Sequence, residues 1–288
     1  MKIIQNILID GKHQKPIVTD VFFQENSLPK PIVIFCHGYK GFKDWGAWNL
    51  VAKEFAKDHF FFVKFNFSHN GGTVKNPIDF PDLNAFGNNN YTIELDDLGS
   101  VIQWVLNNDL YQKEIDTAKV YLIGHSRGGG IVTLKSAENK HISKVVSWAG
   151  VSNFANRFPK NEALKQWEKD GVFYVINART QQQMPHYFQY YQDFKHNEKR
   201  LTIKTAVKKL TIPHLIIHGT TDESVAVDEA HQLHVWNLNS ELFLIENTNH
   251  TFGINHPYNS DQLSAAMNAV VEKTKKFLSN KKEDKSPL

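Results

Sequence analysis

The chain has 288 residues, of which 41% are hydrophobic and 12% aromatic, so it can bury a sizeable core. The net charge of +3 forms no basic stripe interleaved with aromatic residues, and we therefore expect no nucleic-acid partner. A single cysteine, Cys36, cannot form an internal disulfide, and no leader-like segment or run of about 18 apolar residues occurs. We therefore expect a cytoplasmic protein without a membrane partner.

The first half of the chain alternates strand and helix signals. An Asp10-Gly11 turn separates two runs that predict a strand pair, and two later apolar runs predict strands buried on both faces. Between these strands, apolar residues at helical spacing predict helices, and a Gly/Asn/Pro-rich stretch predicts a loop. The expected strands are 2–9, 16–24, 31–38, 60–67, 119–126 and 144–150, the expected helices are 45–59, 92–108 and 128–139, and the loop is 68–90.

The alternation of strand and helix patterns ends after the sixth predicted strand. Residues 151–209 contain many aromatic and charged residues but no good strand run, whereas 213–219 and 241–248 predict strands and 224–236 and 261–279 predict helices. Alternating strands and helices imply an α/β fold with a mostly parallel sheet and helices on both faces. The predicted domains are a core of 1–150 with 210–280, a lid insertion at 151–209 and a disordered tail at 281–288.

One serine lies where a predicted strand gives way to a helix. Residues 124–128 read Gly-His-Ser-Arg-Gly, a G-x-S-x-G pattern in which the serine occupies a sharp turn that leaves no room for side chains two positions away. Such a turn points the hydroxyl outward at a helix N-terminus, where free N–H groups favour negative charge. The context predicts that Ser126 is a nucleophile.

A serine hydroxyl needs a base, and the base needs an acid to orient it. In this fold the order is serine, then Asp or Glu, then His, each following a later strand. Asp222 follows the strand at 213–219 and His250 follows the strand at 241–248, so we predict them as acid and base. Glu223 is the alternative acid. Four other histidines lie nearby in sequence but lack this position, namely His218, His231, His234 and His256.

The oxyanion formed during attack needs two backbone N–H donors. We predict that one comes from Arg127, the residue after the nucleophile. The other should come from the glycine-containing loop after the strand at 31–38, where Tyr39 is the predicted donor.

The stretches HGYKG, GHSRGG, HGTTDESV and NHTFG lie in this order across nearly the whole chain and resemble the α/β-hydrolase superfamily. Within it, the chain looks like dienelactone-hydrolase-related and feruloyl-esterase-like serine hydrolases, and is similar to the catalytic domain of acylaminoacyl peptidases. The resemblance implies the same roles for Ser126, Asp222, His250, Tyr39 and Arg127. Dienelactone hydrolases proper use a cysteine nucleophile. The serine at position 126 departs from that pattern and argues against dienelactone-hydrolase activity.

The residues and the resemblance together predict a serine hydrolase that cleaves carboxylic esters of small or aromatic acyl groups through an acyl-enzyme. The rigid aromatic side chains of 151–209 favour flat groups, and its interspersed charges argue against docking on a lipid surface. A peptidase or amidase with the same triad is the alternative enzyme, and a silent binding protein is the alternative outside enzymes. We expect no cofactor and no metal, because the serine mechanism requires none.

Overall fold

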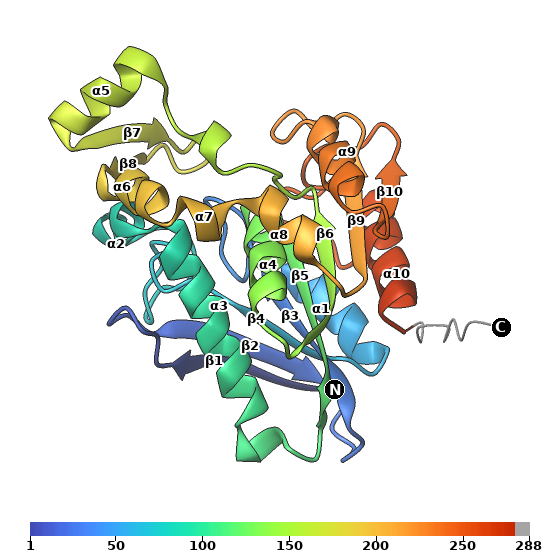
Figure 1. Cartoon of the computed structure of the whole chain (residues 1–288). Coiled ribbons are helices and arrows are strands. Elements are labelled where there is room, and N and C mark those ends of the chain that lie inside the picture. The colour runs from blue at the N-terminus through green and yellow to red at the C-terminus, as the bar shows by residue number, and fades with distance from the viewer. Residues whose placement is uncertain (280–288) are drawn as a thin grey trace.

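An eight-stranded sheet forms the centre of the molecule in the order β1-β2-β4-β3-β5-β6-β9-β10. A computed structural model describes residues 1–279, shown in Figure 1, and the predicted tail at 281–288 lies outside them. The first two strand pairings, β1 with β2 and β2 with β4, are antiparallel, and the remaining neighbours are parallel. The predicted α/β-hydrolase sheet is thereby confirmed. Its strands are β1 Lys2–Ile9, β2 Ile17–Phe23, β3 Lys30–Cys36, β4 Phe61–Phe65, β5 Ile115–His125, β6 Ile142–Trp148, β9 His214–Gly219 and β10 Glu241–Ile245.

Helices cover both faces of this sheet, which is why its central strands are buried along their length. On β3, Ile34 packs into a core formed with α3, α4, α8 and α9, whereas Val33 and Phe35 pack into a second core with α1 and α10. Side chains alternate across a strand, so one strand serves both cores. These helices are α1 Trp48–Lys57, α3 Tyr91–Leu106, α4 Arg127–Glu138, α8 Ile203–Lys209, α9 Val227–Trp236 and α10 Ala265–Ser279.

The segment between β6 and β9 is the insertion, residues 151–209. The prediction that it lacks strands is wrong, because β7 Val172–Ile176 and β8 Gln183–Tyr187 form an antiparallel pair. Pro185 argues against a strand in the sequence, because proline has no backbone N–H to donate. Both strands of a two-stranded sheet are edge strands, however, and an edge strand tolerates the missing N–H. The remaining elements before α8 are the short helix η2 Ala155–Arg157, α5 Asn161–Asp170, α6 Gln189–His196 and α7 Glu198–Leu201.

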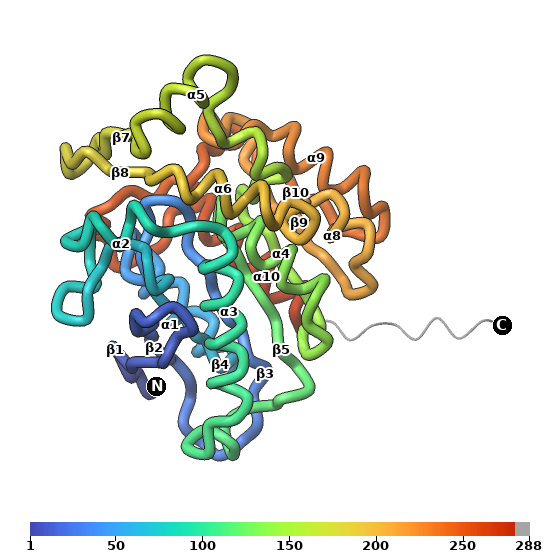
Figure 2. The backbone as a smooth tube through the Cα atoms, turned by 60° about the vertical axis from the view of Figure 1, so that its left-hand side comes forward, coloured from blue at the N-terminus to red at the C-terminus, as the bar shows by residue number. Residues whose placement is uncertain are grey.

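The insertion has two parts with different positions. In Figures 1 and 2, α5 lies at the top and the β7–β8 hairpin at the upper left, on the opposite side from α9, whereas α8 contacts α4 and α9. The last part of the insertion therefore contributes to the helical layer over the sheet. A further short helix, α2 Leu83–Asn88, lies in the region predicted as a loop, where the Asp82 side chain accepts a hydrogen bond from the Ala85 N–H and caps it. It contacts β8.

Candidate active site

The turn between β5 and α4 holds Ser126 in a strained conformation. Its φ is 57° and its ψ is −120°, outside the regions that L-residues prefer. A Cβ at Gly124 would lie 2.2 Å from the Gly128 carbonyl oxygen, and a Cβ at Gly128 would lie 2.4 Å from the Cys36 carbonyl oxygen. Both glycines are therefore required by backbone contacts, and the turn lifts the Ser126 side chain to the edge where the parallel strands end.

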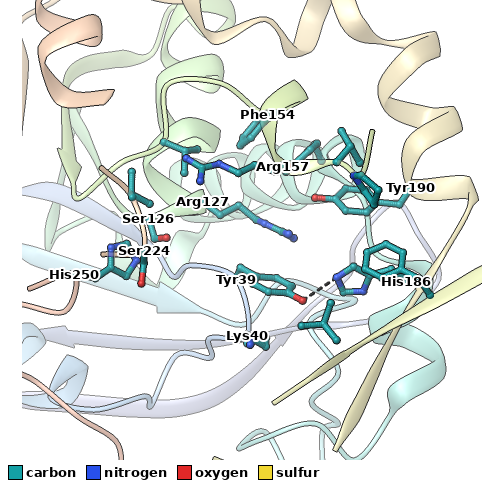
Figure 3. Close-up of a pocket in the computed structure, with 17 residues that line it drawn as sticks. Tyr39, Lys40, Ser126, Arg127, Phe154, Arg157, His186, Tyr190, Ser224 and His250 are labelled. Carbon is teal, nitrogen blue, oxygen red and sulfur yellow. Dashed lines mark hydrogen bonds between the residues drawn. The ribbon is translucent and has the colours of Figure 1, made fainter. Parts of the chain in front are cut away.

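Asp222 and His250 meet at this same edge, although 28 positions separate them in the sequence. The loop after β9 carries the first and the loop after β10 carries the second. The His250 Nδ1–H donates to the Asp222 Oδ2 over 2.7 Å. Because Nδ1 keeps the proton, the Nε2 of His250 can accept one. His250 and Ser126 line the same cavity, as Figure 3 shows.

The carboxylate of Asp222 is held by more donors than the sequence indicates. Its Oδ1 accepts the backbone N–H groups of Ser224 and Val225, over 2.8 and 2.9 Å. His218 Nε2 lies 3.2 Å from the Oδ2 and 2.8 Å from the Val225 carbonyl oxygen. Burial alone would raise the Asp222 pKa, but the hydrogen bonds from His218 and His250 outweigh it and hold the pKa well below its usual range.

A second histidine touches His250 from the sheet side. His125 Nε2–H donates to the His250 carbonyl oxygen over 2.9 Å, and the two ring centroids lie 4.8 Å apart. Burial and then the neighbouring His250 lower the His125 pKa to about 3, so its ring is neutral near pH 7. His125 thus fixes the loop that carries His250.

The loop after β3 approaches Ser126 with its backbone. A Cβ at Gly38 would lie 2.9 Å from the Ser126 Cβ, so only glycine fits beside the nucleophile. The Gly38 carbonyl oxygen accepts the His37 Nδ1–H over 2.8 Å and the Gly41 N–H over 3.1 Å. These two hydrogen bonds fold the loop around Tyr39, one of the two predicted oxyanion donors. The other predicted donor, Arg127, is the first residue of α4.

Four buried charges attach the same loop to the sheet. Lys43 Nζ donates to Asp20 over 2.9 Å and to Asp44 over 2.6 Å, and Lys64 Nζ donates to the same two carboxylates, each over 2.6 Å. We call this set the ion ring. Asp20 belongs to β2 and Lys64 to β4, while Lys43 and Asp44 follow the oxyanion loop. All four side chains are buried or nearly so, and the opposite charges balance.

A cavity of about 540 Å³ opens beside Ser126 (Figure 3). The sheet loops supply the reactive end, and the insertion supplies most of the remaining wall. Tyr39 Oη donates to His186 Nε2 over 2.8 Å and joins the two parts. The wall contains four aromatic side chains of the insertion, which are Phe154, Phe158, Phe173 and Tyr190.

Arg127 crosses this cavity among aromatic rings. Its guanidinium carbon lies 4.5 Å from the ring centre of Tyr39, 5.2 Å from that of Tyr91 and 5.5 Å from that of Tyr190. Its Nη1 donates to Glu94 over 3.2 Å. The Arg127 pKa is raised above its ordinary value because the attraction of Tyr190 and Glu94 outweighs desolvation, so the side chain stays charged.

A second cavity of about 300 Å³ lies on the other side of Ser126. It also reaches His250, and its outer wall is formed by Trp45, Arg179 and His256, with the Trp45 and His256 rings stacked 6.1 Å apart. Two cavities that meet at one hydroxyl provide room for the two halves of an ester.

The structure brings all five predicted site residues to one place, and Glu223 is exposed and lies outside both cavities. Sequence reasoning missed His218, His125, His186 and Tyr190. The first two adjoin predicted site motifs, and their position could have indicated them. His186 and Tyr190 lie in the insertion, where no periodicity places them.

A family model named BD-FAE matches residues 20–237. The chain belongs to the BD-FAE family. Together with the fold, this membership makes it an esterase-like protein of the α/β-hydrolase type. Among curated proteins, none matches the sequence.

Solved structures similar to this BD-FAE chain support the fold. Est1E from Butyrivibrio proteoclasticus with bound ferulic acid is 19% identical, has a TM-score of 0.70, and aligns over 94% of this chain and 97% of its own. A putative dienelactone hydrolase from Klebsiella pneumoniae is 15% identical with a TM-score of 0.61, over 98% and 100%. A dienelactone hydrolase from Anabaena variabilis is 15% identical with a TM-score of 0.60, over 96% and 95%.

Neither metal binding nor a membrane-spanning helix is indicated within residues 1–279. This part of the BD-FAE chain contains no group of three or more His, Cys, Asp or Glu side chains placed to hold a metal ion. None of its helices has the length and hydropathy needed to cross a membrane.

Proposed function

We propose that this chain is a serine esterase in which Ser126 is the nucleophile, His250 the base and Asp222 the acid. One observation carries the proposal: the strained Ser126 turn and the 2.7 Å contact between His250 Nδ1 and Asp222 meet at one cavity. Three loops that follow separate strands bring these groups together at one edge of the sheet.

The proposed reaction uses each group in turn. The Ser126 oxygen attacks the ester carbonyl while His250 Nε2 takes its proton, and the Tyr39 and Arg127 N–H groups stabilise the oxyanion. His250 then gives the proton to the departing alcohol, which leaves an acyl group on Ser126. Water, deprotonated by His250, attacks this acyl-enzyme and releases the acid. Asp222 stays ionised and stabilises the imidazolium in both steps.

The larger cavity favours esters of compact or aromatic acyl groups. Phe154, Phe158 and Phe173 give it flat, rigid apolar walls, and each ring stacked on a substrate ring contributes about 1 kcal/mol beyond the buried area. A cavity of about 540 Å³ is the size of an ordinary small-molecule site. An amino-peptidase would need a carboxylate to hold the substrate's amine. No Asp or Glu belongs to the described lining of this cavity, which argues against a peptidase that holds a free substrate amine.

Covalent labelling tests the nucleophile. A fluorophosphonate probe should label wild type at Ser126, and mass spectrometry of the peptide locates the adduct. Ser126→Ala should lose both labelling and hydrolysis of p-nitrophenyl butyrate. Ser224→Ala is the matched control, because Ser224 lines the same cavity and its contact with Asp222 is made by the backbone. It should label as wild type does. Retained hydrolysis in a folded Ser126→Ala variant contradicts the proposal.

A further inference from the structure

The larger cavity has a polar end that the proposed chemistry does not use. It lies where α4, α3 and α6 meet, and the Arg127 guanidinium points into it between the rings of Tyr39 and Tyr190 (Figure 3). Of the N–H groups on this guanidinium, only that of Nη1 has a hydrogen-bond partner among the described residues, the Glu94 carboxylate on α3. Arg127 belongs to the lining of this cavity.

A buried hydroxyl accompanies these donors. Tyr190 is 7% exposed, and its hydroxyl lies near that of Tyr91 but makes no hydrogen bond of ordinary geometry. An unpaired hydroxyl in such a place costs free energy unless a bound group satisfies it. The hydroxyl of Tyr39 is already used, because it donates to His186, whose pKa is lowered to about 4 by burial and whose Nε2 is therefore an acceptor.

The described lining of the cavity carries cationic side chains but no carboxylate. Arg127 pairs with Glu94 and Arg157 pairs with Glu229, but neither carboxylate belongs to the cavity lining. Lys40 also lines the cavity, and among described residues its ammonium contacts only the ring of Tyr39, 5.2 Å away. Within residues 1–279 the lining therefore presents three cationic side chains and no negative group, because the carboxylates of Glu94, Glu229 and Asp222 all lie behind it.

We propose that this end of the cavity binds a carboxylate carried by the substrate, so that the enzyme prefers esters with a remote anionic group. The inference rests on the proposed esterase function and names its substrate class. Arg127 presents a planar set of donors that matches a carboxylate, and Tyr190 adds a hydroxyl donor. The aromatic walls exclude water and strengthen the interaction. Lys40 and Arg157 attract the anion to the opening.

Matched substrates test this preference on either side of the scissile bond. The acyl series pairs the p-nitrophenyl hemiesters of glutaric and adipic acid with p-nitrophenyl valerate and hexanoate, with spontaneous hydrolysis subtracted. The alcohol series pairs para-carboxyphenyl butyrate with para-carbamoylphenyl butyrate. We expect kcat/KM to favour the charged member of at least one series by about 10-fold or more, and added salt to reduce the preference.

Three variants assign the effect to residues. Arg127→Gln should lower the charged-to-neutral ratio by about 10-fold or more, and Tyr190→Phe should lower it by several-fold. Arg200→Gln removes a surface guanidinium paired with Glu138 and should keep the ratio within about twofold. Each variant is first checked for an unchanged Tm, and Tyr190→Phe provides the decision if Arg127→Gln fails to fold.

The outcomes separate this inference from the proposed function. Hydrolysis of neutral esters without any preference for charge overturns the carboxylate site and leaves the esterase intact. A preference that persists in both Arg127→Gln and Tyr190→Phe also overturns it. If wild type hydrolyses neither member of any pair, the esterase proposal itself fails.

Discussion

The two halves of the candidate site are built in different ways. The sheet half, with Ser126, Asp222 and His250, stands on loops fixed by backbone contacts too close for any added atom. The insertion half, with His186 and Tyr190, is a small hairpin and a helix joined to the sheet half through side chains. The Tyr39–His186 and Thr92–Asp193 hydrogen bonds are two of these links. Under the proposed function, the chemistry depends on the first half, and the second half supplies much of the pocket wall around the substrate.

The largest effect should come from the acid in the sheet half. Asp222→Asn should reduce kcat for p-nitrophenyl butyrate by about a thousandfold to ten-thousandfold, because an amide cannot hold the His250 tautomer or stabilise its charge. Glu223→Gln changes the exposed neighbour and should keep kcat within about threefold. Equal losses in the two variants, or none in either, would show that the acid has been misassigned.

Glycine substitutions compare the rigidity of the halves directly. Gly128→Ala should lower the free energy of unfolding by about 3 kcal/mol, because its Cβ would meet the Cys36 carbonyl oxygen at 2.4 Å. Gly171→Ala, in the insertion, meets nothing within 4 Å and should cost about 1 kcal/mol from its φ of 73° alone. Urea unfolding of both variants gives the values. A larger loss at Gly171 reverses the comparison.

The junction of the halves should respond to pH. Burial lowers the His186 pKa to about 4 in the folded protein. In the unfolded chain the same histidine binds a proton near pH 6.5, so acid favours unfolding between these two pH values. This contribution to stability is present above about pH 6.5 and is lost as the pH falls towards 4. His186→Gln should flatten the fall in unfolding free energy between these values by roughly 1–3 kcal/mol.

Urea titrations at several pH values measure this slope. Gln183→Ala, an exposed position on the same strand, serves as the control and should follow the wild-type slope. A His186→Gln slope identical to that of wild type would show that the junction does not resist protonation.

The smallest expected effect concerns the insertion wall. Phe173→Ala should lower the ratio of kcat/KM for cinnamoyl over acetyl p-nitrophenyl esters by about fivefold, which corresponds to the ~1 kcal/mol of one aromatic contact. Phe188→Ala is the control, because Phe188 packs against Trp167 and Tyr191 and does not line the cavity. Wild-type efficiency that is highest on palmitoyl esters contradicts the proposed acyl preference.

What the sequence could predict follows the same division. Asp222 and His250 could be assigned because parallel strands end at one edge of the sheet. The ends of these strands are visible in the sequence, since apolar residues repeat every two positions in a strand and every 3.6 in a helix. His186 and Tyr190 could not, because β8 contains a proline and the neighbouring strand β7 is half exposed. The partners of Arg127 could not be predicted either, since they come from the loop after β3 and from α3 and α6, separated from Arg127 by dozens of residues.

The ion ring has a consequence for the energy of turnover. For the Tyr39 N–H to move away from Ser126, the loop would have to pull Lys43 and Asp44 from their buried partners, and separating such pairs costs several kcal/mol. The loop is consequently set in position once, during folding, and under the proposed mechanism each catalytic cycle begins with the Tyr39 N–H already placed. Because the donor is already in place, no dipoles have to reorient as the transition state forms, and the reaction barrier does not include that cost.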